Sequence, residues 1–249
     1  MAALRVERDG ETLRVTLARP ERRNAFDAGL IRELTDAFAD VGDARVVLLA
    51  GEGASFCAGA DVEWQRSSID LSFDENLEDA LRLHRMLATV DSCPTPLVAR
   101  VQGHALGGGS GLVACADVAV AAPDTVFGFT EVRLGIIPAV ISPFVFAKIG
   151  PGAARRYFVT GERFSAESAL RIGLVHEVAQ DLDGAVERVV GEILKSGPEA
   201  TRAAKRLARE RPAAGEELAR IAAGLRMGTE GQEGLRAFLE KRRPSWTSS

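Results

Sequence analysis

The chain has 249 residues, a length that favours one large domain over two independent ones. Hydrophobic residues make up 46% and charged residues 27%, so the composition can build a sizeable core and excludes global disorder. The net charge of −4 gives no overall attraction to nucleic acid or to an anionic membrane, and we expect neither as a partner. Three widely spaced cysteines and an N-terminus without an apolar signal core predict buried thiols in a cytoplasmic protein.

The first half of the chain alternates predicted strands and helices. Residues 4–7 and 13–17 flank the Asp9-Gly10 pair and predict a β-hairpin. A helix with apolar residues at helical spacing should follow and end at Gly42, and a second helix is predicted over residues 77–90. Apolar runs predict strands at residues 46–50, 97–101 and 118–122. This alternation indicates right-handed crossovers and a mostly parallel sheet, and therefore an α/β fold.

The last part of the chain contains only predicted helices, over residues 183–196, 199–210, 216–227 and 231–242. We expect an α/β core of residues 1–196 and a C-terminal helical region of residues 197–249. The helical region is too small to bury its own apolar residues, which include Leu225, Leu235 and Phe238. It should pack against the core or against another subunit.

A glycine-rich segment, GHALGGGSG at residues 103–111, follows a predicted strand and precedes a helix expected to begin near Leu112. Consecutive glycines let main-chain N–H groups approach an anion or a developing oxyanion closely. A tight structural turn is the alternative. Residues 109–114 also fit the dinucleotide pattern G-x-G-x-x-A, but the predicted strand ends well before Gly109 and only Asp124 offers a candidate for holding a ribose.

A second glycine-bearing segment, SFCAGAD at residues 55–61, also follows a predicted strand. Two such segments at neighbouring strand ends can each present one N–H to the same oxygen. As a purely structural turn, the segment would use Asp61 to cap the next helix. Glu131 lies in an apolar stretch, where desolvation would raise its pKa as general acid–base catalysis near neutral pH requires. An exposed or Arg133-paired glutamate is the alternative.

Five segments together resemble the crotonase family, the enoyl-CoA hydratase and isomerase superfamily, in their order and spacing. They are RPERRNAF (19–26), FCAGADV (56–62), GHALGGG (103–109), CADVAVA (115–121) and TEVRLGIIP (130–138). The resemblance implies a crotonase-like ββα spiral core with a C-terminal helical region, acting on an acyl-CoA thioester. It implies no metal and no separate cofactor, because CoA arrives with the substrate.

The resemblance also assigns roles to individual residues. The two oxyanion-hole amides would fall on Ala60 and Gly108, and Glu131 would match the second of two catalytic glutamates. The first glutamate would stand at Gly111, which has no side chain. Substrate contacts are implied at Arg23 (CoA phosphates), Ala58, Asp61, Trp64 (acyl pocket), Gly111, and Phe238 and Lys241 (the CoA end of an adjacent site).

These features predict an enoyl-CoA hydratase of fatty acid metabolism. Two alternatives remain: a Δ3,Δ2-enoyl-CoA isomerase that uses Glu131 as its sole acid–base group, and a non-catalytic acyl-CoA-binding homologue. Residues 131–145 look most like bacterial hydratases of branched, carboxylated enoyl-CoAs in leucine degradation. The dehalogenase branch is disfavoured because its aspartate would be expected near Ala139. The resemblance further implies a homotrimer or a hexamer built as a dimer of trimers.

Overall fold

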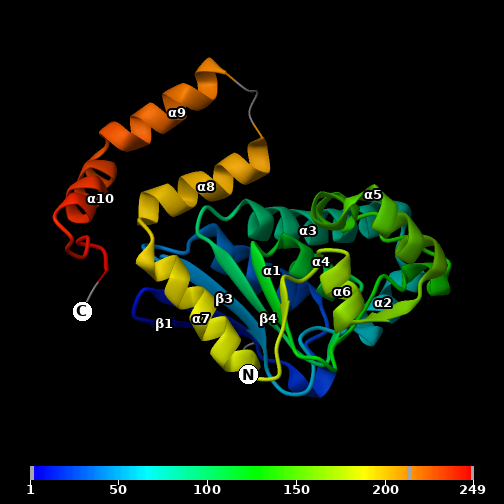
Figure 1. Ribbon diagram of the computed structural model, residues 1–249. Coiled ribbons are helices and arrows are strands. Elements are labelled where there is room, and N and C mark those ends of the chain that lie inside the picture. Colours follow the sequence, from blue (N-terminus) through cyan, green and yellow to red (C-terminus); the bar gives the residue numbers. More distant parts are fainter. Residues whose placement is uncertain (1–2, 212–214, 248–249) are drawn as a thin grey trace.

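A computed structural model describes residues 3–211 and 215–247 of the chain. It consists of an α/β body and an arm of two helices that extends from it (Figure 1). The body contains a six-stranded sheet in the order β1-β2-β3-β4-β6-β9 and a smaller sheet in the order β5-β7-β8. The predicted α/β class is confirmed. Within the described ranges, no helix is both long and apolar enough to cross a bilayer.

The large sheet begins with an antiparallel hairpin and continues with parallel strands. The predicted hairpin is confirmed, and Gly10 in its turn has a φ of 57°, which glycine adopts without steric cost. The strands are β1 (Leu4–Asp9), β2 (Thr12–Leu17), β3 (Val46–Gly51), β4 (Leu97–Val101), β6 (Val118–Ala121) and β9 (Glu177–Val178).

Both faces of the large sheet are covered by helices. Along β3, Val47 and Leu49 belong to the main core, whereas Val46 and Leu48 belong to a second apolar cluster beneath α7. A strand buried on both faces needs apolar residues at every position, which explains its continuous apolar run. The covering helices are α1 (Ala28–Ala39), α3 (Phe73–Ser92) and α4 (Gly108–Cys115) on one face and α7 (Leu182–Lys195) on the other.

The three cysteines, Cys57, Cys93 and Cys115, are free and buried, as predicted. Burial raises the pKa of the Cys57 thiol to about 12. A thiol held in this protonated form is a poor nucleophile. Cys57 therefore contributes packing to the core.

Two helices begin earlier than predicted. Helix α3 starts at Phe73 because Ser72 and Glu75 form a reciprocal capping box at its N-terminus. Helix α4 starts at Gly108, so Gly109 and Gly111 lie inside its first turns and are buried. The dinucleotide reading of residues 109–114 is therefore wrong, because no exposed loop is left there to receive a pyrophosphate.

Several elements had no clear sequence pattern. Helix α5 is interrupted at Gly150, which has a φ of 72° and precedes Pro151, so the helical periodicity is broken in mid-element. Helix α5 spans Ser142–Thr160, and helix α2, which Asp61 caps, spans Val62–Ser67. The other unpredicted elements are short: β5 (His104–Leu106), β7 (Val126–Gly128), β8 (Arg163–Ser165), α6 (Ala166–Arg171) and β9.

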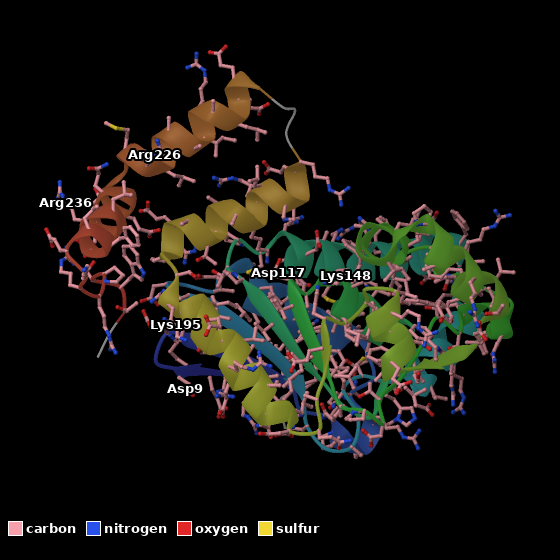
Figure 2. All side chains as sticks on the ribbon, in the orientation of Figure 1. Asp9, Asp117, Lys148, Lys195, Arg226 and Arg236 are labelled. Atoms are coloured by element: carbon pink, nitrogen blue, oxygen red, sulfur yellow. The ribbon has the colours of Figure 1, made fainter. Side chains whose placement is uncertain are left out.

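Helix α8 (Pro198–Glu210) is fixed to the body by a buried lysine. Lys205 Nζ lies 2.7 Å from the Asp117 carboxylate and donates to the Thr95 carbonyl at 3.0 Å. Asp117 lies below α8 in Figure 2. The next helices, α9 (Glu216–Met227) and α10 (Thr229–Leu239), form the arm, and Figure 2 shows Arg226 and Arg236 on it, away from the body.

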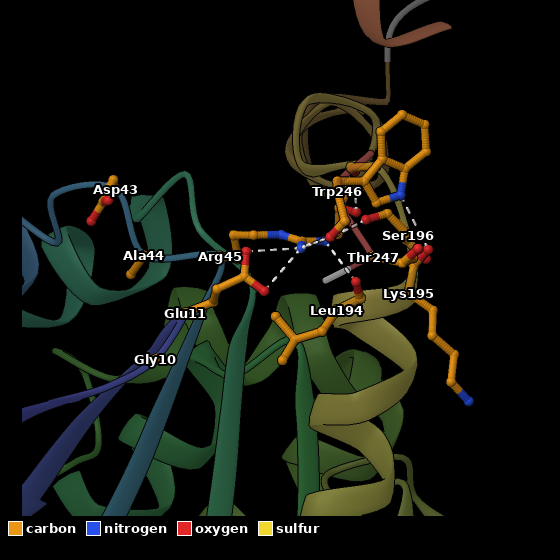
Figure 3. A network of polar contacts seen from close by, with 12 residues as sticks. Gly10, Glu11, Asp43, Ala44, Arg45, Leu194, Lys195, Ser196, Trp246 and Thr247 are labelled. Atoms are coloured by element: carbon orange, nitrogen blue, oxygen red, sulfur yellow. Dashed lines mark hydrogen bonds and ion pairs between the residues drawn. The ribbon is translucent and has the colours of Figure 1, made fainter. Parts of the chain in front are cut away.

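The C-terminal segment returns to the body at Arg45, which precedes β3 and is 9% exposed (Figure 3). Its Nη1 donates to the Glu11 carboxylate at 3.0 Å and to the Trp246 carbonyl at 2.8 Å. Its Nη2 donates to the carbonyls of Leu194 and Ser196 at the end of α7. These carbonyls carry the negative end of the α7 dipole, which a cation stabilises.

Candidate active site

A cavity of about 310 Å³ lies between α2, α3, the start of α4 and the segment that precedes α5. Five residues named from the sequence line it together: Ala58, Ala60, Trp64, Gly108 and Glu131. They come from segments up to about 70 residues apart in the chain, since the first is Ala58 and the last is Glu131. The fold therefore brings the two glycine-bearing segments and the candidate acid–base residue to one site.

Backbone bridges hold the two glycine-bearing segments together. Cys57 N–H donates to the His104 carbonyl at 2.9 Å, and Leu106 N–H donates to the Cys57 carbonyl at 3.0 Å. On its other side the first segment is bound to Phe26, whose N–H donates to the Gly59 carbonyl at 2.7 Å. The segments are thus fixed relative to each other before any ligand arrives.

Two main-chain donors at the cavity have no acceptor. Within the part of the chain that the structure describes, neither the Ala60 N–H nor the Gly108 N–H makes a hydrogen bond to backbone or side chain. Gly108 is the first residue of α4, where an N–H has no partner inside the helix and carries the positive end of the helix dipole. Two such donors can bind an oxygen on which negative charge develops.

Gly108 has a packing reason to lack a side chain. A Cβ atom built on it would lie 2.8 Å from the Phe26 ring. Such a contact is too close for carbon atoms, so a larger residue would displace the ring or the start of α4. The position of this N–H donor depends on glycine at position 108.

Glu131 opens a short 3-10 helix, Glu131–Leu134, and lines the cavity. Its Oε2 is buried and, among the described residues, has no hydrogen-bond partner. Burial raises the pKa of the carboxyl because the charged form loses its hydration. The Arg133-paired alternative is not seen, since no ion pair among the described residues includes Glu131 and its Oε2 has no partner. Glu131 therefore keeps its proton to a higher pH than an exposed glutamate does, which favours a role as proton donor.

The other residues named from the sequence lie outside the cavity wall. Asp61 is 3% exposed; it accepts the Glu63 N–H at 2.8 Å as the cap of α2 and lies 3.3 Å from Arg19. Arg23 is exposed, in a left-handed conformation, and its carbonyl accepts the Ala58 N–H. Phe238 is 80% exposed near the end of α10, and Lys241 follows it. Their contacts with CoA remain predictions.

Sequence reasoning missed the contribution of α3. Asn76, Asp79, Ala80 and Leu83 all line the cavity. Their spacing of three to four residues places them on one face of the helix, and this spacing was the available signal. Asp79 also accepts a hydrogen bond from Trp64 Nε1 at 3.1 Å, so two lining side chains are joined across α2 and α3.

Comparisons with known proteins identify the family. The chain matches the model of the enoyl-CoA hydratase/isomerase family over residues 7–249. The chain belongs to this family. It is 33% identical to crotonyl-CoA hydratase from Syntrophomonas wolfei, over 98% of this chain and 97% of that protein. The predicted family membership is therefore confirmed.

Solved structures of relatives share the whole fold. The structure of Pseudomonas aeruginosa AtuE superposes with a TM-score of 0.94 at 36% identity, covering 99% of this chain and all of that one (100%). An enoyl-CoA hydratase from Shewanella pealeana gives a TM-score of 0.91 at 36% identity, covering 98% and 96% of the two chains. The expected crotonase-like core with C-terminal helices is confirmed.

This family member has no room for a side chain at position 111, where the resemblance places the first catalytic glutamate. Gly111 is buried in α4 and does not line the cavity. A Cβ atom built there would lie 2.8 Å from Ile141 Cγ2. Ile141 itself lines the cavity, so an apolar surface stands where a carboxylate was expected.

Proposed function

We propose that the chain is an enoyl-CoA hydratase that adds water across the 2,3 double bond of an enoyl-CoA thioester. One observation carries this proposal. The same cavity is lined by Ala60 and Gly108, whose main-chain N–H groups have no partner among the described residues, and by Glu131, whose Oε2 is buried. Crotonyl-CoA hydratase is among the relatives that the chain matches along nearly its full length. Addition of water to an enoyl thioester forms an enolate and then protonates C2, so it needs both an oxyanion site and a proton donor.

In this proposal the Ala60 and Gly108 N–H groups bind the thioester oxygen. Addition of water at C3 moves the π electrons towards C2 and the thioester oxygen, and the two donors stabilise the resulting enolate. In subtilisin, removal of one oxyanion donor costs about 2.7–4 kcal/mol in the transition state. Glu131 then gives its proton to C2, which its raised pKa favours, and the water gives up one of its protons to a base or to solvent, so that one water is added in total.

A Δ3,Δ2-enoyl-CoA isomerase is the second candidate. Gly111 leaves Glu131 without the partner glutamate that usually shares the water in hydratases, and one carboxyl group can shuttle a proton between C2 and C4. A third candidate is an acyl-CoA-binding protein without turnover.

One assay separates the three candidates. Purified protein is incubated with crotonyl-CoA, 3-methylglutaconyl-CoA and a 3-enoyl-CoA, and products are followed by absorbance and chromatography. Hydration of at least one 2-enoyl-CoA is expected. Double-bond migration without hydration supports the isomerase, and thioester binding without product supports the non-catalytic protein. Turnover of 3-methylglutaconyl-CoA would place the protein in leucine degradation, as residues 131–145 suggest.

The proposal also covers the location of the enzyme, its cofactor requirement, CoA binding and assembly. We expect a cytoplasmic enzyme that needs no metal or separate cofactor and whose Arg23 binds the CoA phosphates. The exposed apolar residues of the arm, such as Leu239 at 77% and Met227 at 76%, support assembly into a trimer or a dimer of trimers. In such an assembly Phe238 and Lys241 would reach the CoA end of a neighbouring site.

A further inference from the structure

Asp79 places a second carboxylate in the wall of the cavity that contains Glu131. It projects from the second turn of α3, an element on which neither the glycine-rich segments nor the family motifs lie. Its side chain is 20% exposed, in contrast to most acidic residues of the same helix, such as Glu78 at 43%. A carboxylate that is mostly withdrawn from solvent and faces a reaction cavity calls for a chemical explanation.

The Asp79 carboxylate is held in a fixed orientation. Oδ2 accepts a hydrogen bond from Trp64 Nε1 at 3.1 Å, and Oδ1 lies 2.8 Å from Arg82 Nη1. Each of these two donors occupies one lone pair of the carboxylate, which offers about four acceptor positions. Asp79 can therefore accept a hydrogen bond from a water molecule in the cavity without losing either contact.

The two carboxyl groups of the cavity have opposite surroundings. Asp79 has two donors on its oxygens, whereas Glu131 has a buried Oε2 with no partner among the described residues. A carboxylate with free lone pairs beside its two donors can accept a proton from water, whereas burial without a partner favours the protonated form of Glu131. Water addition needs one group of each kind, a base at C3 and an acid at C2.

Helix α4 cannot provide the second carboxylate, since Ile141 closes the space next to Gly111. The cavity receives it from α3 instead.

We propose that Asp79 is the second catalytic carboxylate, which binds and deprotonates the water that attacks C3. The proposal rests on the hydratase function proposed above. The water O–H bond breaks and its proton passes to Asp79 as the O–C3 bond forms. The π electrons move to C2 and the thioester oxygen, and C2 takes the proton of Glu131. Release of a proton from Asp79 to solvent and uptake of one by Glu131 restore both groups.

The test separates water addition from proton transfer at C2. Hydration of crotonyl-CoA requires both carboxyl groups, whereas exchange of the C2 protons of saturated butyryl-CoA in D₂O requires only Glu131 and the two N–H donors. Asp79→Asn should lower the kcat of hydration by at least about 100-fold and leave the exchange rate within about twofold. Glu131→Gln should lower the rates of both reactions by at least about 100-fold. A merely structural role for Asp79 would lower both together.

Glu78→Gln is the matched control. Glu78 precedes Asp79 on α3 and lies 3.6 Å from the same Arg82, but it does not line the cavity. This exchange should leave hydration and proton exchange unchanged. If Asp79→Asn does not fold, Asp79→Ser gives a second test, because added formate can occupy the vacated space and should restore hydration without affecting exchange.

The outcomes distinguish this proposal from the one on which it rests. If the wild-type chain hydrates crotonyl-CoA and Asp79→Asn hydrates it equally well, the role of Asp79 alone is overturned. Equal losses of hydration and exchange in that variant overturn it as well. If the wild-type chain exchanges C2 protons but hydrates no thioester of the panel, the hydratase function is overturned and the role of Asp79 with it.

Discussion

The side chain of Ile141 fills the space into which a side chain at position 111 would project. Its Cγ2 would lie 2.8 Å from a Cβ atom on Gly111, and Leu87 Cδ1 would lie 3.8 Å from the same atom. The absence of a carboxylate at this position is therefore part of the packing between α3, α4 and the segment before α5. A glutamate cannot be restored there without moving neighbouring side chains.

Gly111→Glu should destabilise the fold without increasing hydration. Overpacking of a well-filled site typically costs about 1–3 kcal/mol. Chemical denaturation measures the change in the free energy of unfolding. In the double variant Gly111→Glu/Ile141→Ala the clash with Cγ2 is removed, so stability should partly recover. A single Gly111→Glu variant as stable as the wild type would show that the neighbours adjust freely and that packing does not dictate glycine.

Glu131→Gln should lower kcat and leave acyl-CoA binding largely intact. The amide keeps the shape of the side chain but cannot deliver a proton, and general acid–base catalysis is worth about 10²–10⁴-fold. Steady-state kinetics and calorimetric titration with butyryl-CoA measure the two quantities. Glu167→Gln, on the surface of α6, is the matched control and should behave like the wild type. An unchanged kcat would assign the proton to another group.

The stability difference between the wild type and Glu131→Gln should depend on pH. Burial raises the pKa of Glu131, so the native chain keeps this proton at pH values where the unfolded chain has lost it. The stabilising contribution is complete below the ordinary pKa of 4.5 and is lost as the pH rises through the native value. The Gln variant does not titrate here. Its free energy of unfolding relative to the wild type should be greater at pH 8 than at pH 4; the opposite trend would contradict a raised pKa.

Arg45→Ala should destabilise the chain more than removal of an exposed arginine. It leaves the carbonyls of Leu194, Ser196 and Trp246 without their donor, and hydrogen bonds to charged groups are worth about 1.5–3 kcal/mol each in a buried setting. We expect a loss of at least about 2 kcal/mol. Arg8→Ala is the comparison, since Arg8 pairs with Asp43, whose side chain is 97% exposed, and such pairs contribute about 0–1 kcal/mol. Equal effects in thermal unfolding would refute a special role for Arg45.

Light scattering should give a mass of three or six chains at micromolar concentration. Apolar residues of the arm such as Phe238 and Leu239 are largely exposed in the single chain, and the described residues of α9 include no buried one. Phe238→Glu, which places a charge at a side chain that is 80% exposed in the single chain, should shift the population towards smaller species. The secondary structure of the full chain, followed by circular dichroism, should be unaffected by this change. A monomeric wild type would contradict the assembly.

Strands and helices were predictable from the sequence where the pattern of apolar residues was unbroken. Doubly buried strands such as Val46–Gly51 show continuous apolar runs, and the helices of the arm show regular periodicity. Helix α5 was missed because Gly150 and Pro151 interrupt its pattern. The start of α4 was placed too late because glycines, which favour loops elsewhere, here allow close contacts with Cys57 and Phe26. Such contacts depend on tertiary packing and leave no local signal.

The cavity was predictable in part. Ala60, Gly108 and Glu131 follow motifs whose order along the chain is specific, and the fold brings them together. Asp79 could not be singled out, because it lies among the acidic residues of an otherwise charged helix, and its value as a candidate comes from the Trp64 contact and the cavity. A carboxylate on a helix surface is usually a solvated group, and only the three-dimensional structure distinguishes this one.

The bond between Arg45 and the Trp246 carbonyl joins residues 201 positions apart in the chain. During synthesis on the ribosome, the strands and helices that build both apolar clusters emerge before this carbonyl does. The body can thus complete its core first, while Arg45 holds only its contacts with Glu11 and the end of α7. We therefore expect attachment of the C-terminal segment to be a late event in folding, after the body has formed its core.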